Sequence, residues 1–574
     1  MRDTWWSAER YQDNRNLYNG YSVPKNTHKE TDIMKTTIGK LLEDRAKEYP
    51  DKDAVVFNDR RISYKELNEE AERLAYFLKK RGVGKGDKVA IWLTNLPEWV
   101  VAWFAIPKIG AVVVPTDPWY KASEIEYMFN DSDTKAVITT EKAGRYNFKG
   151  ILEDVGSSLE KLKTVVMLEG ESDKLPVVSY EDAIQDGEGW QDDQDYMSLK
   201  EKTDPDDVTF ILYTSGTTGK PKGVMLTHHQ ITKNARDIGD ILKANPDDKL
   251  MIPVPFSHCF GNTLSITLIV DFGGTMIPME DFHPKRALEL VEEEGVTMIH
   301  GVPTMFIREL EQLKKGDHDT STLRTGIMAG STCPVETMQS VIKDMGCNVS
   351  IVYGLTEASP GVTMTRFDDT VEDRVETVGR VLPDQEIKVV DDEGKEVAPN
   401  ETGELLVKGY NVMVGYYKNP EATEETVENG WLHTGDLAEM DERGYVKIVG
   451  RKKDMVIVGG FNVYPREIEE YLIEHPDIRE VAVVGIPDKD LGEVIAAAVI
   501  PFENSELTAQ DVVDSLYGKV ASAKVPRYVA ITDEIPHSGR GKVQKFKLRD
   551  ILADKVKEGE LPKMVPTKVK EKKK

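Results

Sequence analysis

Between residues 64 and 139, segments with the apolar spacing of helices alternate with short apolar runs that are typical of strands. Helices are predicted at Tyr64–Arg81 and Glu98–Lys108, and strands at Val89–Leu93, Ala111–Val114 and Ala136–Thr139. Strands that are separated by helices of roughly ten or more residues pair mostly in parallel, with the helices covering the sheet. This alternation therefore predicts a layered α/β fold.

The pattern changes near residue 450, where the charged connector Gly450–Asp454 follows a short predicted strand. Beyond it the sequence predicts helix Pro465–Glu474, strand Glu480–Gly485, strand Val494–Pro501 and helix Thr508–Val520. At 574 residues the chain is long enough for several compact units. The predicted organisation is an N-terminal extension (1–35), a large N-terminal domain with several layered α/β subdomains (36–450), a hinge (451–453), a small, mobile α+β C-terminal domain (454–560) and a basic tail (561–574).

Charge and cysteine content exclude several classes of protein. The formal net charge is -26, and the basic run Lys568–Lys574 alone does not make a nucleic-acid-binding face. The 3 cysteines have no metal-ligand spacing and predict a reduced, cytoplasmic compartment. No run approaches the roughly 18 apolar residues that a transmembrane helix needs, whereas peripheral contact with a membrane stays open. A monomer and a homodimer are both compatible with the sequence.

The segment Tyr213–Gly223, YTSGTTGKPKG, combines the residue types that bind phosphate. Its glycines allow tight turns, its hydroxyls and successive backbone N–H groups can surround phosphate oxygens, and Lys220 and Lys222 add positive charge. It follows an apolar predicted strand, Val208–Leu212. The spacing differs from GxxxxGK[ST], because only two residues separate its first two glycines and proline follows the first lysine. We therefore predict a phosphate loop of another kind.

YTSGTTGKPKG closely resembles the signature of the adenylate-forming superfamily, which includes acyl-CoA synthetases, luciferases and the adenylation domains of peptide synthetases. Further segments similar to motifs of this family follow in its order: PFSHCFG at Pro255–Gly261, GVPT at Gly301–Thr304, GST at Gly330–Thr332, YGLTE at Tyr353–Glu357, TGD ending at Asp436, GRKKD at Gly450–Asp454, VGGFNVYP at Val458–Pro465 and PHSGRGKV at Pro536–Val543. The resemblance extends over roughly residues 36 to 555 and implies the fold of an adenylate-forming enzyme.

The resemblance also implies an ATP-dependent, AMP-forming acid–thiol ligase that uses ATP, CoA and Mg²⁺ and acts on small molecules. Its motifs assign nucleotide contacts to Thr214, Ser215, Gly216, Thr217, Thr218, Gly219, Lys220, Lys222, Gly330, Ser331, Thr332, Tyr353, Gly354, Thr356, Asp436, Arg451 and Lys542. By the same resemblance, Glu357 and Thr214 bind the metal, in keeping with the preference of Mg²⁺ for oxygen ligands.

The remaining roles that the resemblance implies concern catalysis, movement and the other two substrates. The residues expected to be catalytic are Lys542, Glu357, Thr214 and His258. The hinge is expected to pivot at Lys453, and the residues expected on the CoA side are Gly459, Gly460 and Phe461. The residues expected in the acyl pocket are Phe256, His258, Gly261, Val302 and Met328.

Taken singly, most of these residues also have an ordinary structural explanation. His258 fits a core histidine, Glu357 a solvated carboxylate and Asp436 a turn residue, and the apolar pocket candidates fit ordinary core equally well. The segment 322–336 is most similar to medium-chain fatty acyl-CoA synthetases, and Pro255–Gly261 is similar to long-chain relatives as well. We predict a medium- to long-chain fatty acid as substrate. An aryl or alicyclic acid, or transfer of the acyl group to a carrier protein, is the alternative.

Overall fold

The computed structural model describes residues 35–144, 146–214, 220–316, 318–331, 333–537 and 543–567. The N-terminal extension up to residue 34, the loop residues Ser215–Gly219, Thr332, Lys542 and the end of the basic tail lie outside this range. The chain divides into two units. One contains the described residues up to Ile387 together with Leu406–His433, and the other contains Lys388–Leu405 and the described residues from Thr434 onward.

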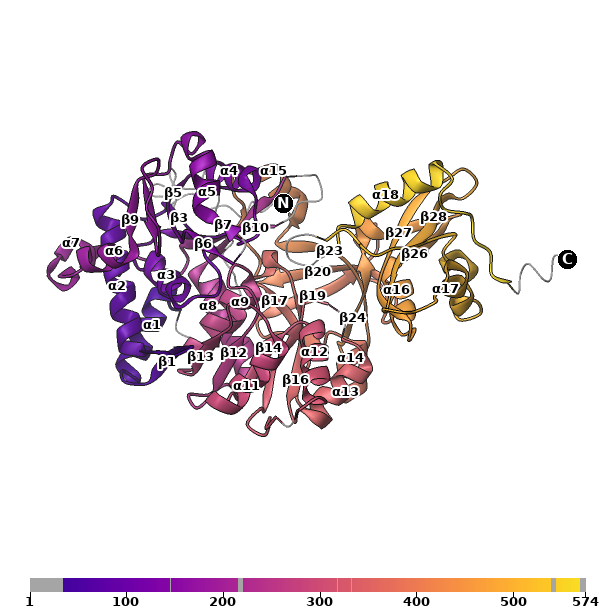
Figure 1. Ribbon diagram of the computed structural model, residues 1–574, viewed down its shortest axis with the longest axis horizontal. Coiled ribbons are helices and arrows are strands. Elements are labelled where there is room, and N and C mark those ends of the chain that lie inside the picture. The colour runs from indigo at the N-terminus through magenta and orange to yellow at the C-terminus, as the bar shows by residue number, and fades with distance from the viewer. Residues whose placement is uncertain are drawn as a thin grey trace, which may run out of the picture. The chain divides into compact units, whose positions relative to one another are not determined.

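Two large sheets form the frame of the first unit (Figure 1). In hydrogen-bonding order, one sheet contains β18 (Arg380–Val381), β17 (Gly361–Met364), β16 (Asn348–Gly354), β15 (Thr325–Ala329), β14 (Met298–Gly301), β12 (Lys249–Ile252), β13 (Thr275–Pro278), β1 (Asp53–Phe57) and β2 (Arg60–Ser63). The other contains β21 (Gly415–Tyr416), β11 (Lys222–Thr227), β10 (Val208–Thr214), β4 (Val112–Pro115), β3 (Lys88–Trp92), β5 (Thr134–Thr139), β8 (Thr164–Met167) and β9 (Val177–Ser179). The central strands of both sheets pair in parallel, which confirms the predicted pairing.

Helices fill the space between these sheets and cover their outer faces (Figure 1). The helices packed against both sheets are α2 (Tyr64–Lys80), α3 (Pro97–Lys108) and α8 (His228–Ile241). The outer helices are α11 (Pro284–Glu294), α12 (Pro303–Leu313) and α13 (Val335–Asp344) on one sheet, and α4 (Ala122–Asp131) and α5 (Phe148–Val155) on the other. Along β4, Val113 belongs to the central cluster and its neighbours Val112 and Val114 to an outer one, because side chains alternate between the faces of a strand. The layers therefore follow the order αβαβα.

Local sequence explains where the central helices begin and which faces they bury. Helix α2 begins with a capping box, in which the Glu66 backbone N–H donates to Ser63 Oγ (3.2 Å) and the Ser63 N–H donates to the Glu66 carboxylate (2.8 Å). All residues of α3 are buried, as expected for a helix that is apolar on every side. Further elements of this unit are α1 (Ile38–Glu48), β6 (Lys142–Ala143), β7 (Tyr146–Asn147), α6 (Tyr180–Asp186), α7 (Gln194–Glu201), α9 (Cys259–Gly261), the π-helical η4 (Asn262–Thr267), α10 (Leu268–Asp271), α14 (Val371–Glu376) and α15 (Pro420–Thr426).

The second unit is built around an antiparallel sheet with one parallel edge. Its strands are β26 (Phe461–Val463), β25 (Val456–Val458), β28 (Gly492–Pro501) and β27 (Ile478–Asp488), with β29 (Tyr528–Ile531) parallel to β28. Helices α16 (Pro465–Ile473) and α17 (Ala509–Leu516) cover one face, and α18 (Lys545–Lys557) covers the other. The strands β19 (Gln385–Val390), β20 (Gly403–Gly409), β22 (Val427–Glu428), β23 (Trp431–Met440) and β24 (Val446–Arg451) form a further sheet.

One predicted helix in this unit is too long. Helix α17 ends at Leu516 and not at Val520. The backbone of Tyr517 is extended (φ -64°, ψ 122°) and Gly518 follows in the left-handed region at φ 79°. A glycine at positive φ is a common way to end a helix, so the Tyr517–Gly518 pair marks the true boundary.

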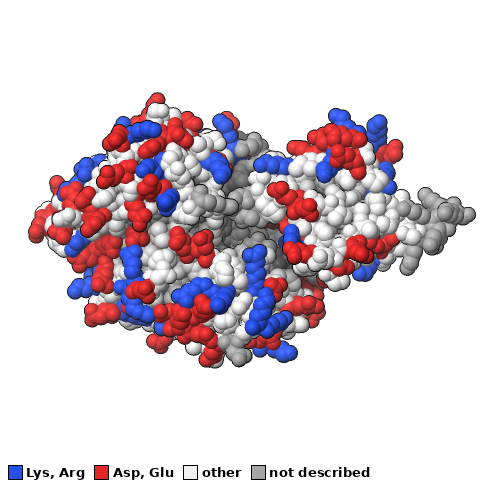
Figure 2. Space-filling model, viewed as in Figure 1, with Lys and Arg blue, Asp and Glu red and all other residues white. Residues whose placement is uncertain are grey.

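Figure 2 shows acidic and basic side chains interspersed over the visible face. Within the described ranges, every helix is too short or too polar to span a lipid bilayer.

Candidate active site

The predicted phosphate loop connects two antiparallel strands. Thr214 ends β10 and lies opposite Lys222, the first residue of β11. Ser215–Gly219 lie outside the described residues, whereas the ammonium of Lys220 lies 5.3 Å from the ring centroid of Tyr127. A P-loop connects a strand to a helix, so the connection between β10 and β11 differs from a P-loop.

Glu357 is held by a segment that sequence analysis did not single out. It lies in the short helix η5 (Thr356–Ala358), directly after β16. The Tyr416 hydroxyl donates a hydrogen bond of 3.0 Å to Glu357 Oε1, and the Met413 backbone N–H donates one of 2.9 Å to the Glu357 carbonyl. The Tyr416 ring also lies 4.8 Å from the ammonium of Lys222. The structure thus links Thr214, Lys222 and Glu357 through Tyr416.

The predicted adenine-side residues lie at the carboxyl ends of neighbouring strands. Strands β15 and β16 are parallel, with Ala329 opposite Val352, so the residues that follow them share one edge of the sheet. Gly330 adopts φ 89°, a conformation that suits glycine, and a Cβ atom at Gly354 would lie 1.9 Å from the Pro360 carbonyl oxygen. Ligands of α/β proteins commonly bind at such an edge.

The other residues predicted on the adenine side lie at or directly after the same ends of β15 and β16. Tyr353 is half-buried, Ser331 is exposed and Thr332 lies outside the described residues. Thr356 is buried, and its Oγ1 lies 3.8 Å from the Cys259 sulfur, which brings the YGLTE and PFSHCFG segments together.

The predicted acyl-pocket residues are only partly brought together. A Cβ atom at Gly330 would lie 3.3 Å from Val302, so the acyl and adenine predictions meet there. His258 is half-buried and its Nδ1 accepts the Phe260 backbone N–H at the start of α9 (3.2 Å). Phe256 packs in the central cluster, whereas Met328 packs in the outer cluster beneath α12 and α13.

Gly261 is required by packing in the same segment. A Cβ atom there would lie 2.1 Å from the Pro255 carbonyl oxygen, which is far closer than van der Waals contact. A glycine at this position therefore allows the PFSHCFG segment to fold back on itself.

In the second unit, two predicted nucleotide-binding residues bind each other. Arg451 Nε lies 2.7 Å from Asp436 Oδ1, and Asp436 is buried. The Asp436 N–H donates to Thr434 Oγ1 (3.1 Å), which fixes the strand at this point. A carboxylate held in this way can still accept hydrogen bonds from vicinal hydroxyls, because it has several lone pairs.

The predicted hinge and CoA-side residues lie on short, exposed elements of the second unit. Lys453 is exposed in η6 (Lys452–Asp454). Gly459 (φ 58°) and Gly460 (φ 88°) form the turn between β25 and β26. Two positive φ angles are typical of a type I′ hairpin, and they place Phe461 at the start of β26 with 70% of its surface exposed. Lys542 lies outside the described residues.

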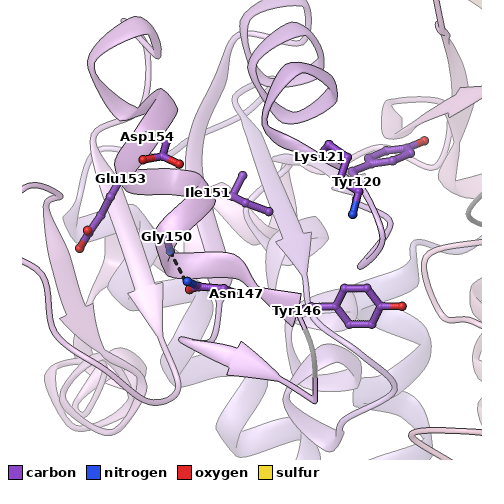
Figure 3. Close-up of a pocket in the computed structure, with 8 residues that line it drawn as sticks. All are labelled: Tyr120, Lys121, Tyr146, Asn147, Gly150, Ile151, Glu153 and Asp154. Atoms are coloured by element: carbon purple, nitrogen blue, oxygen red, sulfur yellow. Dashed lines mark hydrogen bonds between the residues drawn. The ribbon is translucent and has the colours of Figure 1, made fainter.

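A separate pocket of about 390 Å³ lies beside α5 and contains none of the predicted site residues (Figure 3). Its lining residues are Tyr120, Lys121, Tyr146, Asn147, Gly150, Ile151, Glu153 and Asp154. The Asn147 side chain accepts the Gly150 N–H at 2.9 Å and so caps α5. Asn147 therefore has a structural role in this pocket, as the N-cap of α5.

Comparison with known families identifies the class of enzyme. Residues 42–417 match the model for AMP-binding enzymes, and residues 467–542 match that for the AMP-binding enzyme C-terminal domain. The chain therefore belongs to the AMP-binding enzyme family. Within this family it is an acyl-CoA ligase, a class of enzyme that uses ATP, CoA and Mg²⁺.

Individual relatives match along most of their length. YngI of Bacillus subtilis, whose own assignment as an acyl-CoA synthetase is provisional, is 43% identical over 90% of this chain and 97% of YngI. The mitochondrial medium-chain acyl-CoA ligase ACSF2 of Mus musculus is 34% identical over 92% of this chain and 90% of ACSF2. The anthranilate CoA ligase AuaEII, solved with anthranoyl-AMP, has a TM-score of 0.80 at 25% identity and covers 91% of this chain and 98% of AuaEII.

The described residues fit the metal ion that this family uses. In nucleotide sites Mg²⁺ usually binds one or two protein oxygens together with substrate phosphates and waters. Glu357 offers a carboxylate at the end of β16, and Thr214 offers a hydroxyl at the mouth of the phosphate loop. In the described part of the chain, no three His, Cys, Asp or Glu side chains gather around one point. Two protein oxygens suit an ion that binds together with the nucleotide phosphates.

Proposed function

We propose that this enzyme converts a medium- to long-chain fatty acid, ATP and CoA into the fatty acyl-CoA, AMP and pyrophosphate. The observation that carries the proposal is the 34% identity with a medium-chain acyl-CoA ligase over 92% of the chain. The apolar character of the predicted acyl side supports it. Phe256 and Phe260 are buried, and the Phe260 ring stacks on His300 with 5.7 Å between centroids. Burial lowers the pKa of His300 to about 3, so this ring is neutral near pH 7 and adds no charge there.

In the first step, a carboxylate oxygen of the acid attacks the α-phosphorus, and the bond from that phosphorus to pyrophosphate breaks. Both reactants are anions, so alignment and charge neutralisation dominate catalysis. On our assignment the loop N–H groups and Lys222 bind the phosphates, and Lys542 stabilises the charge that develops between carboxylate and phosphate. Mg²⁺, held by Glu357 and Thr214, supplies further positive charge when bound. Asp436 accepts the ribose hydroxyls and so orients the nucleotide.

In the second step, the CoA sulfur attacks the acyl carbon of the mixed anhydride, and AMP leaves. The two steps need different groups around one reacting carbonyl. On our assignment the small domain turns about Lys453, which withdraws Lys542 and presents the Gly459–Phe461 hairpin to the thiol. Domain movements of this kind complete an active site in many enzymes.

A pyrophosphate-release assay tests the substrate. The purified protein is given ATP, Mg²⁺ and acids from acetate to stearate, together with benzoate-type acids, with and without CoA. We expect the highest kcat/KM for a fatty acid of medium or long chain, and acyl-CoA as the product. A preference for aryl acids would instead support the alternative suggested by the similarity to AuaEII. Failure to form AMP with any acid would refute the proposal.

A further inference from the structure

Tyr416 is fixed in place by its backbone on two sides. It is the last residue of β21 and pairs with Val224 of β11, the strand that begins with Lys222 at the phosphate loop. Its own N–H donates a 2.9 Å hydrogen bond to Thr423 Oγ1 in α15. The side chain is 5% exposed, so the ring has little freedom to reorient. Position and orientation of the Tyr416 hydroxyl are therefore set by the surrounding fold.

Two hydrogen bonds from the same segment hold Glu357. The Tyr416 hydroxyl reaches Glu357 Oε1 at 3.0 Å, and the Met413 N–H reaches the Glu357 carbonyl at 2.9 Å. One contact orients the carboxylate and the other fixes the backbone that carries it. A hydrogen bond to Oε1 leaves Oε2 available to a metal ion, because an ionised carboxylate offers about four lone-pair positions.

The same ring faces the phosphate loop. The Lys222 ammonium lies 4.8 Å from the Tyr416 ring centroid, within the range of a cation–π interaction. Lys222 lies opposite Thr214, the other predicted metal ligand. Tyr416 therefore contacts both the carboxylate and the loop strand between which Mg²⁺ and the phosphates are expected.

We infer that Tyr416 is a positioning residue for Mg²⁺–ATP, whose hydroxyl orients the Glu357 carboxylate toward the metal and whose ring holds Lys222 beside the phosphates. This inference rests on the proposed function, because it assigns the metal to Glu357. Groups that orient metal ligands typically contribute roughly 10–100-fold to metal affinity or activity.

The test compares Tyr416→Phe with Tyr417→Phe. The Tyr417 hydroxyl donates a 3.1 Å hydrogen bond to Asp133 Oδ2, so the control removes the same type of bond from the next residue, away from Glu357. Calorimetry measures ATP binding to each full-length protein without acid substrate, once with Mg²⁺ and once with EDTA. For Tyr416→Phe we expect unchanged ATP affinity in EDTA and affinity about tenfold weaker than the parent in Mg²⁺. Tyr417→Phe should match the parent in both.

Kinetics supply the second readout. Tyr416→Phe should lower kcat/KM for Mg²⁺–ATP while the KM for the acid stays at the parent value. Equal loss of ATP affinity with and without Mg²⁺, parental behaviour of Tyr416→Phe, or the same defect in Tyr417→Phe would each overturn the inference. A parent protein that binds ATP more tightly with Mg²⁺ but forms no AMP with any acid would instead refute the proposed function.

Discussion

A glutamate that is buried without a partner should make the stability of the first unit depend on pH. Glu309 lies in α12 with 1% of its surface exposed, and in the described structure neither carboxylate oxygen has a hydrogen-bond partner. Burial raises the pKa of Glu309 to about 8, from an ordinary value of 4.5. The buried thiol of Cys347 lies close enough for the charge of Glu309 to act on it, since burial and then Glu309 raise the pKa of Cys347. The carboxyl is therefore expected to be neutral in the folded protein at pH 7.

The magnitude follows from the two pKa values. Between about pH 4.5 and about pH 8 the folded state keeps a proton that the unfolded chain has released, so stability falls as the pH rises. Each pH unit in this window costs about 1.4 kcal/mol. From about pH 5.5 to about pH 7.5 the loss is thus about 3 kcal/mol. For a unit of roughly 400 residues, this corresponds to about 3 °C in Tm.

Glu309→Gln removes the titration but keeps the size of the side chain. Thermal unfolding of the parent and the variant should show that the Tm of the parent falls relative to that of Glu309→Gln by about 3 °C between about pH 5.5 and about pH 7.5. Glu311→Gln is the matched control, because Glu311 lies exposed on the same helix, and this variant should follow the parent. A difference between the parent and Glu309→Gln that stays constant with pH would refute the reasoning.

Three further predictions concern the proposed site and the core. Lys542→Ala should abolish adenylate formation but largely spare thioester formation from supplied acyl-AMP, and equal loss of both half-reactions would contradict the assigned role. Asp436→Asn should raise the KM for ATP about tenfold, because a hydrogen bond to a charged group contributes about 1.5–3 kcal/mol, and an unchanged KM would exclude a ribose contact. Lys108→Met should lower the free energy of unfolding by about 2 kcal/mol, because Lys108 and Glu72 form a 2.9 Å ion pair with side chains 1% exposed, while Glu72 keeps a second ion pair with Lys200 at 2.6 Å. An unchanged free energy of unfolding in denaturant titration would contradict this prediction.

Periodicity was sufficient to predict the layers of the first unit but not its strand order. The helix Tyr64–Lys80 and the strands β3, β4 and β5 lie within a few residues of their predicted bounds, because apolar spacing reports which face is buried. Pairing between distant segments leaves no such local signal. The pairing of β25 with β26, by contrast, does have a local signal. Gly459 and Gly460 stand between two apolar runs, which is a typical sequence pattern of a β-hairpin.

The hydrogen bond between Tyr416 and Glu357 could not be predicted from sequence motifs. The resemblance of YGLTE to a family motif assigns the metal to Glu357, but the tyrosine that donates a hydrogen bond to its carboxylate lies 59 residues further along the chain. Nothing in the local sequence of Tyr416 indicates that its ring is buried against Lys222. Such supporting residues are defined by tertiary contacts, so only the folded structure reveals them.

The pair Asp436–Arg451 lies beside a single extra residue in β24. From the turn outward, Met440 lies opposite Val446 and Ala438 opposite Ile448, and this register would place Gly450 opposite Asp436. The register shifts between Leu437 and Ala438, so that β24 contains one residue more than β23 over this stretch. If the same residues paired without this bulge, Arg451 would move by one position and its side chain would point to the other face of the sheet. The bulge thus brings together one residue from each of two separate motifs. Deletion of Val449 should remove the bulge and leave a regular ladder in which Gly450 still lies opposite Leu437 and Arg451 opposite Asp436, so the ion pair should persist.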